Sequence, residues 1–210
     1  MMQAVIMAGG KGTRLAALTK DEIPKPMVPV AGKPLLLWQV ERLKENGITD
    51  IIMVIGHLGD KIKEYFGDGE KFGVSIRYFE ETEPLGTAGS FYYLKDMIHG
   101  DRFVMMSGDL FFDIDFQRMI RFHQEKGAVA TLFVHPNGHP FDSDLLVLDK
   151  DDKIIAFDSK HNVRDCWYEN CVNAGIFVFE KKICDYVPEP VKRNLENDVI
   201  KGMLEAGEPI

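Results

Sequence analysis

Three glycines and a group of basic residues lie together near the start of the chain. Gly9, Gly10 and Gly12 follow the apolar run 4–8, so the backbone can adopt positive φ there and bring its N–H groups close to an anion. Residues 11–33 contain five basic side chains and two acidic ones, although the chain of 210 residues carries a net charge of −8. The stretch therefore predicts a loop that binds a phosphorylated ligand, with a purely structural tight turn as the alternative.

Two common phosphate-binding loops do not match this stretch. A P-loop needs Ser or Thr after its lysine, but Gly12 follows Lys11, and the dinucleotide fingerprint needs a glycine where Leu15 stands. A structural turn would leave Arg14 and the segment Pro24-Lys25-Pro26 unexplained. The two prolines restrict the backbone on both sides of the lysine, which limits the entropy lost when its side chain is aimed at a ligand.

The same residues resemble the signature of the sugar-1-phosphate nucleotidylyltransferase family. Residues 8–15 read A-G-G-K-G-T-R-L and are followed by Pro24-Lys25-Pro26 and Gly32-Lys33-Pro34. In that family an oxygen of a sugar 1-phosphate attacks the α-phosphorus of a nucleoside triphosphate, and pyrophosphate leaves. The likeness continues in the family's order through residues 56–57, 65–69, 83–89, 107–109 and 172–177, and so covers nearly the whole chain.

The resemblance implies that Arg14, Lys25 and Asp109 are catalytic, with Asp109 as the ligand of Mg²⁺. Transfer of this kind requires in-line positioning and charge stabilisation, which basic side chains and loop N–H groups can provide. An aspartate at the end of a strand is by itself more often a turn or cap residue. One carboxylate is sufficient for Mg²⁺, because phosphate oxygens and water complete its coordination.

The segment 83–89 corresponds to the loop beside the nucleobase in that family. Residues 87–89 are expected to begin a helix whose first N–H groups are free, and a plain strand-to-helix turn is the alternative. The resemblance implies nucleotide-binding roles for Ala8, Gly9, Gly10, Gly12, Thr13, Arg14, Lys25, Glu83, Gly86 and Thr87.

The second half of the chain would supply the sugar-phosphate site. The resemblance places Asp144, Lys160, Asn173 and Gly175 there. Ser159 stands where relatives often carry a glutamate that contacts sugar hydroxyls, and the acidic triplet 142–144 replaces a common Tyr-Gly pair. We therefore expect an altered sugar pocket.

The segment 135–145 is similar to a loop of the manno-heptose guanylyltransferase branch. A heptose carries one hydroxymethylene group more than a hexose, so the shorter Ser159 would leave room and Asp144 would offer an acceptor. A metal site at His135 and His139 is the less favoured alternative, because a loop rich in proline and glycine does not fix two histidines on one face.

These residues predict a Mg²⁺-dependent enzyme that uses GTP and a manno-heptose or mannose 1-phosphate. Thymidylyl, uridylyl and cytidylyl transfer are the alternatives within the family. A noncatalytic sugar-nucleotide-binding or regulatory homologue is the rival class, because relatives carry a second Mg²⁺ ligand in an Asp-Ile-Gly-Thr-Pro-like segment that is not found before Ile210. The chain is shortened, or continues beyond Ile210, or Glu196 or Asp198 replaces that ligand.

Alternating strand and helix patterns predict the scaffold of this site. The first half has strand patterns at 3–8, 51–55, 74–79 and 103–107, and helix patterns at 35–43, 60–66, 87–98 and 116–126, the last capped by Asp115. This alternation predicts an α/β fold with a Rossmann-like, doubly wound, mostly parallel sheet, as in glycosyltransferase A-like proteins. Active sites of such sheets lie beyond the carboxyl ends of the strands, where the glycine loop, segment 83–89 and Asp109 fall.

The second half predicts antiparallel strands added to that sheet. Strand patterns occur at 128–135, 145–148, 153–157 and 172–179, with a hairpin turn at 149–152 and a helix at 194–206. We expect one domain, 1–210, in which residues 1–127 form a nucleotide-binding half and 128–210 a sugar-phosphate-binding half.

Composition excludes several classes of protein. The acidic net charge of −8 argues against a binder of nucleic acid or of anionic membranes. No signal peptide or membrane span is visible, and three cysteines without paired spacing indicate reduced thiols, so the cytoplasm is the expected location. The expected partners are a nucleoside triphosphate and a sugar 1-phosphate, and the sequence is compatible with a homo-oligomer.

Overall fold

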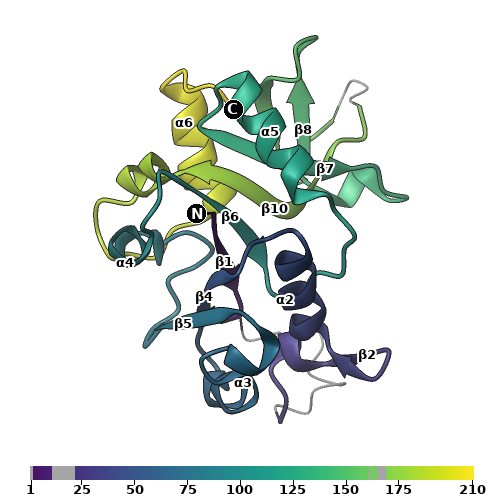
Figure 1. The fold of residues 1–210 in the computed structure, drawn as a ribbon. Coiled ribbons are helices and arrows are strands. Elements are labelled where there is room, and N and C mark those ends of the chain that lie inside the picture. The colour runs from purple at the N-terminus through teal and green to yellow at the C-terminus, as the bar shows by residue number, and fades with distance from the viewer. Residues whose placement is uncertain (1, 11–21, 161, 165–168) are drawn as a thin grey trace.

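Four parallel strands form the first part of the main sheet. In the computed structural model, which describes residues 2–10, 22–160, 162–164 and 169–210, β1 (Gln3–Met7) lies between β4 (Asp50–Ile55) and β6 (Arg102–Ser107), and β5 (Ser75–Glu80) pairs with β4 (Figure 1). Val5 pairs with Ile52 on one side and with Met105 on the other. The apolar runs of these strands suit a sheet that is covered on both faces.

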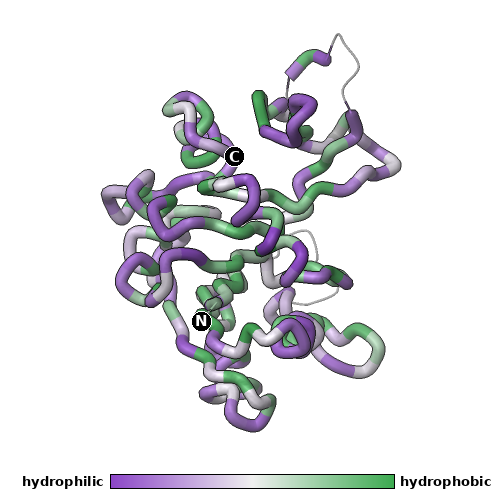
Figure 2. Tube along the Cα trace, turned by 45° about the horizontal axis from the view of Figure 1, so that its top comes forward, coloured by the Kyte–Doolittle hydropathy of each residue, from purple (hydrophilic) through white to green (hydrophobic). Residues whose placement is uncertain are grey.

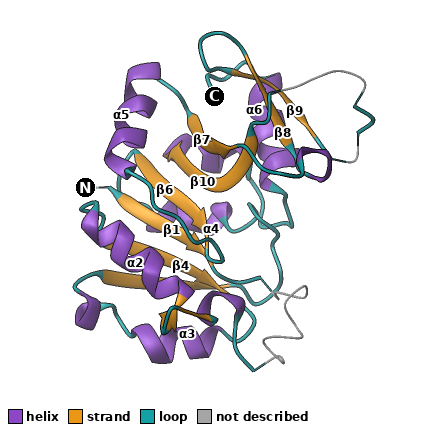
Figure 3. Cartoon of the chain, turned by 90° about the vertical axis from the view of Figure 1, so that its right-hand side faces the viewer, coloured by secondary structure: helices purple, strands orange, loops and turns teal. Residues whose placement is uncertain are grey.

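Helices cover both faces of this sheet. On one face, α2 (Leu35–Glu45), α3 (Gly59–Phe66) and α5 (Phe116–Lys126) pack against Ala4 and Ile6. On the other face, α4 (Phe91–Met97) packs against Val5. Figure 3 shows α2 on the side of the sheet that faces the viewer and α4 behind it. Asp115 caps α5 as predicted, because its Oδ1 accepts a hydrogen bond of 2.9 Å from the Arg118 N–H.

Strands from the second half extend the sheet in the antiparallel direction. The strands are β7 (Ala130–His135), β8 (Leu145–Leu148), β9 (Ile154–Asp158) and β10 (Val172–Glu180). The sheet has the order β5-β4-β1-β6-β10-β8-β9, with β7 also paired to β10. In the tube of Figure 2, hydrophobic residues run through the interior along these strands. The predicted fold class, with a parallel first half and antiparallel additions, is confirmed.

A bulge bends β10 where it passes the end of β6. The register of its pairing with β7 shifts between Asn173 and Phe177, and Gly175 lies in the left-handed region at φ 74°. A Cβ added to Gly175 would lie 3.2 Å from the Ser107 Oγ. The bulge therefore brings the start of β10 close to the carboxyl end of the parallel strands.

The predicted helix over 87–98 begins later than expected. Residues 86–90 form a turn, and α4 starts at Phe91. The Ala88 N–H donates to the Arg193 carbonyl at 3.1 Å and the Gly89 N–H to the Leu85 carbonyl at 3.2 Å. The prediction of free N–H groups was therefore wrong for Ala88, which pairs with a segment more than a hundred residues later in the chain, and for Gly89, which bonds within the loop.

Shorter elements complete the chain. The predicted hairpin turn at 149–152 is present, and its Asp149 Oδ1 accepts hydrogen bonds from two backbone N–H groups. The helix predicted over 194–206 is a π-helix (Leu195–Ile200) followed by α6 (Lys201–Glu205). No helix among the described residues is long and apolar enough to cross a membrane. The remaining elements are β2 (Pro29–Val30), β3 (Lys33–Pro34) and 3-10 helices at Lys25–Met27, Glu70–Phe72, Pro140–Asp142 and Lys181–Tyr186.

Candidate active site

A cavity of about 900 Å³ opens at the carboxyl ends of the parallel strands. Its walls come from residues just after β1, β4, β5 and β6, together with the segment that carries Lys25 and Pro26. Parallel strands end at the same edge, so loops that are far apart in the sequence meet there. The cavity lies where the sequence predicted a site.

Lys25 and Asp109 form an ion pair on the cavity wall. The Lys25 Nζ donates a hydrogen bond to the Asp109 Oδ2, and the two side chains are 31% and 33% exposed. Lys25 is the first residue of the 3-10 helix Lys25–Met27; the preceding Pro24 is extended, and the following Pro26 is buried. Asp109 follows Gly108, whose N–H donates to the Met7 carbonyl at 2.8 Å. Opposite charges therefore meet between the ends of β1 and β6.

The described part of the glycine loop lies against the neighbouring strand ends. The Ala8 N–H donates to the Val54 carbonyl at 2.7 Å. A Cβ added to Gly9 would lie 3.3 Å from the Gly56 N, whereas one added to Gly10 would meet no atom of the described residues within 4 Å. A side chain at position 9 would therefore crowd the backbone after β4, whereas the described residues leave space beside Gly10. The predicted residues Gly12, Thr13 and Arg14 lie outside the described residues.

Glu81 is a cavity residue that the sequence analysis missed. It follows β5, its Oε1 is buried and has no hydrogen-bond partner among the described residues, and burial raises the pKa of its carboxyl group to about 7. A hydrogen bond from the Leu85 N–H offsets part of that shift. The predicted Glu83 is exposed and is not among the cavity-lining residues. The signal that could have found Glu81 is its place directly after a parallel strand.

The loop at 85–89 is held by the second half of the chain. The Arg193 N–H donates to the Leu85 carbonyl at 3.0 Å, and the Leu195 N–H donates to the Thr87 Oγ1 at 2.7 Å. Gly86 has φ +77°, and a Cβ at this position would lie 2.3 Å from the Arg193 carbonyl oxygen. Both predicted residues of this loop, Gly86 and Thr87, line the cavity.

The predicted sugar-phosphate residues lie together at the start of β8 and of β10. The Asn173 Oδ1 accepts from the Gly175 N–H at 3.0 Å, and its Nδ2 donates to the Glu196 Oε1 at 3.4 Å. Burial, and after it the charge of Asp144, raises the pKa of Glu196. The Asp144 Oδ1 accepts from the Lys160 N–H at 2.9 Å. Glu196 thus faces Asn173 and Asp144.

Asp109 is the described residue best suited to a divalent cation in the cavity. Its carboxylate is a hard oxygen ligand, which suits Mg²⁺ when phosphate oxygens and water complete the coordination. Among residues 2–10, 22–160, 162–164 and 169–210, no group of three or more His, Cys, Asp or Glu side chains is arranged to hold a metal ion. The Asp198 carboxylate accepts from the Asn194 N–H at 2.7 Å, which is a helix-end contact. Asp109 therefore fits a cation whose other ligands come from a bound nucleotide and water.

Comparison with known proteins adds sequence and structural relatives. Residues 3–210 match the profile of a family described as nucleotidyl transferase. A UTP–glucose-1-phosphate uridylyltransferase of Synechocystis sp. is 34% identical over 221 residues, which cover 99% of this chain and 56% of that protein. A probable mannose-1-phosphate guanylyltransferase 1 of Oryza sativa subsp. japonica is 35% identical over 191 residues, which cover 89% of this chain and 52% of that protein.

The fold also matches solved structures. HddC from Yersinia pseudotuberculosis superposes with a TM-score of 0.81 and 26% identity, over 96% of this chain and 86% of that chain. A second structure of that protein contains GMP-PN. The present chain spans about half the length of the curated relatives it matches, at 56% and 52% of the two described above.

Proposed function

The chain belongs to the nucleotidyl transferase family, and we propose that it makes a nucleoside-diphosphate sugar and pyrophosphate from a nucleoside triphosphate and a sugar 1-phosphate. The observation that carries this proposal is the cavity in which the glycine-loop backbone, Lys25 and Asp109 meet at the ends of β1 and β6. Asn173 and Gly175 lie next to that edge through the bulge of β10.

The chemistry needs charge and alignment more than proton transfer. An anionic oxygen of the sugar 1-phosphate forms a bond to the α-phosphorus as the bond from that phosphorus to the β-phosphate oxygen breaks, and pyrophosphate carries away the electron pair. Lys25 would stabilise the charge that develops on the phosphates, and the N–H groups of Gly9 and Gly10 would orient them. Mg²⁺ bound at Asp109 would neutralise part of the triphosphate charge. The family resemblance assigns Arg14 to the same phosphates.

The half-buried carboxyl group of Glu81 supports guanine as the base. An ionised carboxylate only accepts hydrogen bonds, and the Watson–Crick edge of guanine presents two adjacent donors, N1–H and N2–H. Uracil and thymine present one N–H donor between two carbonyl acceptors, so one carboxylate oxygen would face an acceptor. GMP-PN in HddC is consistent with the choice of GTP.

Uridylyl transfer is the second candidate, supported by the Synechocystis relative at 34% identity. A protonated Glu81 is both donor and acceptor, which matches the O4 and N3–H of uracil. A noncatalytic homologue is less favoured, because simple binding does not require a lysine and a metal-binding carboxylate against the same phosphates.

A manno-configured sugar, and within that group a manno-heptose 1-phosphate, is the proposed acceptor. Asp144 and Asn173 would receive sugar hydroxyls, with Lys160 toward the phosphate and Gly175 against the ring. A polar site discriminates strongly against an analogue that lacks the matching hydroxyl, because buried polar groups are then left unpaired. Asp144 would make that distinction for the extra hydroxymethylene group.

A pyrophosphate-release screen tests this function. The protein is incubated with Mg²⁺, each of four nucleoside triphosphates, and a panel of sugar 1-phosphates that includes mannose and manno-heptose. We expect the highest kcat/KM for GTP with manno-heptose 1-phosphate, and none in the presence of a chelator. Equal kcat/KM for the two sugars would contradict the preference for a heptose, and a preference for UTP would contradict guanine as the base. No pyrophosphate release with any pair of substrates would contradict the proposed enzymatic activity.

A further inference from the structure

Arg164 is a buried guanidinium that the site description does not use. Its side chain is 7% exposed, and that of its ion-pair partner Asp158 is 11% exposed. The Arg164 Nε donates to the Asp158 Oδ2 at 2.5 Å, and one Nη2 hydrogen bond of 3.1 Å reaches the Asp158 carbonyl. Two further donors reach a different segment, with Nη1 bonded to the Pro140 carbonyl at 2.5 Å and Nη2 to the Ser143 carbonyl at 2.6 Å.

This arginine therefore ties two segments together at the open end of the β8–β9 hairpin. Leu145 at the start of β8 pairs with Asp158 at the end of β9, while the turn of the hairpin lies at the opposite end. The 3-10 turn 140–142 leads directly into β8. Arg164 has five N–H donors in a fixed planar arrangement, so it can hold a carboxylate and several carbonyls simultaneously.

Two proposed sugar-phosphate residues lie at this same end of the hairpin. Asp144 directly follows Ser143, and its Oδ1 accepts from the Lys160 N–H at 2.9 Å. Lys160 in turn lies two residues after Asp158. The clamp made by Arg164 thus fixes the backbone on both sides of the Asp144–Lys160 contact.

Polar contacts accompany the clamp on the side of the 140–142 turn. Phe141 is 81% exposed and Val163 is 95% exposed, so these two described hydrophobic side chains are not buried there, whereas Leu145 at the start of β8 is buried. On the other side of the turn, Asn137 and Asn170 are joined by hydrogen bonds of 3.3 and 2.7 Å, and the Asn137 Nδ2 donates to the Ser143 Oγ at 2.7 Å. Polar contacts, with Arg164 at their centre, set the geometry here.

We infer that Arg164 is a positioning residue for the sugar 1-phosphate: through the 140–143 turn and Asp158 it places Asp144 and Lys160 to receive that substrate. The inference rests on the proposed function. A displacement of about 1 Å at a substrate-positioning group is enough to weaken a reaction strongly, so loss of the clamp affects the sugar substrate first. The nucleoside triphosphate would bind at the parallel-strand cavity, which contains none of these residues.

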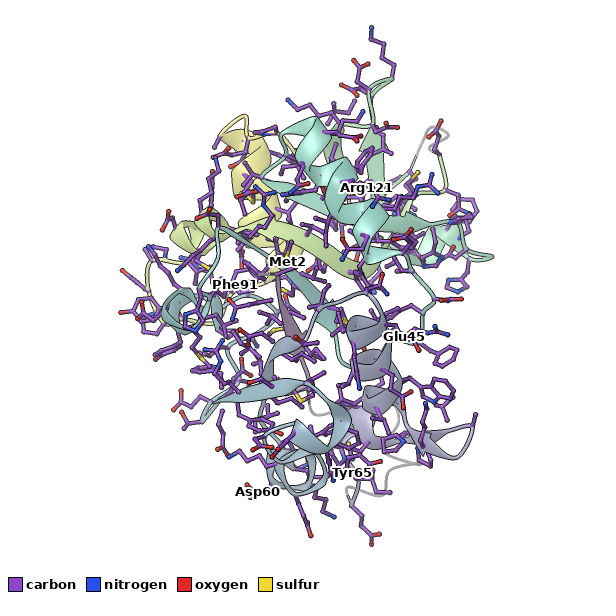
Figure 4. All side chains as sticks on the ribbon, in the orientation of Figure 1. Met2, Glu45, Asp60, Tyr65, Phe91 and Arg121 are labelled. Carbon is purple, nitrogen blue, oxygen red and sulfur yellow. The ribbon has the colours of Figure 1, made fainter. Side chains whose placement is uncertain are left out.

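The test compares steady-state kinetics of the full chain with Arg164→Lys, Arg164→Ala and Asp158→Asn. The control is Arg121→Ala, which removes an arginine from the outer side of α5 (Figure 4). We expect the KM for the sugar 1-phosphate to rise by roughly tenfold in Arg164→Lys and further in Arg164→Ala, because charge-assisted hydrogen bonds are lost. The KM for the triphosphate stays within about twofold, and Arg121→Ala changes neither KM, since it leaves both sites intact.

The outcomes separate this inference from the proposed function. Pyrophosphate release by the unmodified protein, together with an unchanged sugar KM in both Arg164 variants, overturns the positioning role alone. A parallel rise of the KM for the sugar 1-phosphate and the KM for the triphosphate would also overturn the positioning role. Loss of the cooperative thermal transition in all three clamp variants would overturn it as well, because Arg164 would then be needed for folding. No release by the unmodified protein with any substrate pair overturns both.

Discussion

Glu81 presents a carboxyl group to the cavity at a pKa of about 7, so its charge changes near neutral pH. Burial is the main cause of the shift, and the protonated form is favoured below that value. Lys25, Asp109 and His57 line the same cavity, so other charged or titratable groups can affect activity with either nucleotide. The ratio of kcat/KM between two nucleotides isolates the contribution of the group that contacts the base. Because an ionised carboxylate matches guanine and a protonated one matches uracil, protonation of Glu81 would change the base that is preferred.

We predict that the ratio of kcat/KM for GTP to that for UTP rises by about tenfold between pH 6 and pH 8, as the Glu81 carboxylate ionises. Glu81→Gln should lower this ratio and remove its pH dependence, because an amide donates and accepts at every pH. Glu80→Gln is the matched control, since Glu80 bonds to Lys63 at 2.5 Å and does not line the cavity. A ratio that stays constant with pH in the unmodified protein would show that Glu81 does not contact the base.

Lys25 and Asp109 are predicted to act mainly in the transition state. Lys25→Ala should lower kcat more than it raises the KM for the triphosphate, because the lysine charge is needed most in the pentacoordinate transition state at the α-phosphorus. Asp109→Asn should lower turnover by roughly a hundredfold or more while thermal unfolding changes little, since both side chains are about one-third exposed. A pure KM effect for Lys25→Ala would make it a binding residue only.

At the scale of elements, the contact between the 85–89 loop and Arg193 connects the two halves of the chain. Gly86 combines a left-handed φ of +77° with a Cβ position 2.3 Å from the Arg193 carbonyl oxygen. Gly127 has φ +59° with nothing within 4 Å of its Cβ position, so it shares the backbone conformation without the close contact. Substitution of Gly127 therefore measures the cost of the left-handed backbone alone, and substitution of Gly86 measures that cost together with the steric clash against Arg193.

We predict that Gly127→Ala lowers the free energy of unfolding by about 1 kcal/mol, which is the usual cost of a left-handed alanine. Gly86→Ala should cost distinctly more and should also raise the KM for the triphosphate, because the loop must move away from Arg193. Urea unfolding and steady-state kinetics measure the two effects. Equal losses of stability in both variants, with no change in the KM for the triphosphate, would show that the contact between Gly86 and Arg193 does not constrain this loop.

The sequence correctly predicted the helices and strands that depend on signals within a few neighbouring residues. Apolar runs located β1, β4, β5 and β6, and Asp115 marked the start of α5, because strand periodicity and helix caps are read within a few residues. The start of α4 was missed because Arg193 pairs with Ala88 across the molecule. Glu81 was missed for a related reason, since its burial depends on loops that meet only in the fold. Of the predicted site residues that the structure describes, most lie near the cavity or the start of β10.

At the scale of the whole molecule, β10 joins the parallel and antiparallel parts into one sheet. It pairs with β6 through residues such as Phe177 and Phe179, and Phe179 lies 5.8 Å from Phe103 between ring centroids. All three rings are almost fully buried. Without β10, the edge of β6 and these aromatic side chains would be exposed to solvent.

We predict that residues 1–127 alone do not form a stable unit, although they contain the whole parallel half. Circular dichroism and size-exclusion chromatography of this fragment should show no cooperative thermal transition and a tendency to aggregate, because an uncovered central strand is a template for pairing. The full chain, as the control, should unfold in one transition. A soluble, cooperatively folded fragment would show instead that the two halves are independent.

The place of β10 also has a consequence for how the protein is made. β10 lies near the middle of the sheet but leaves the ribosome well after β1, β4, β5 and β6, so the nascent chain keeps one edge of β6 uncovered until residues 172–180 have emerged. Pairings between such distant segments also form slowly. During that interval the uncovered edge of β6 can pair with other chains, so rapid overproduction should lead to inclusion bodies sooner than the stability of the folded protein would suggest.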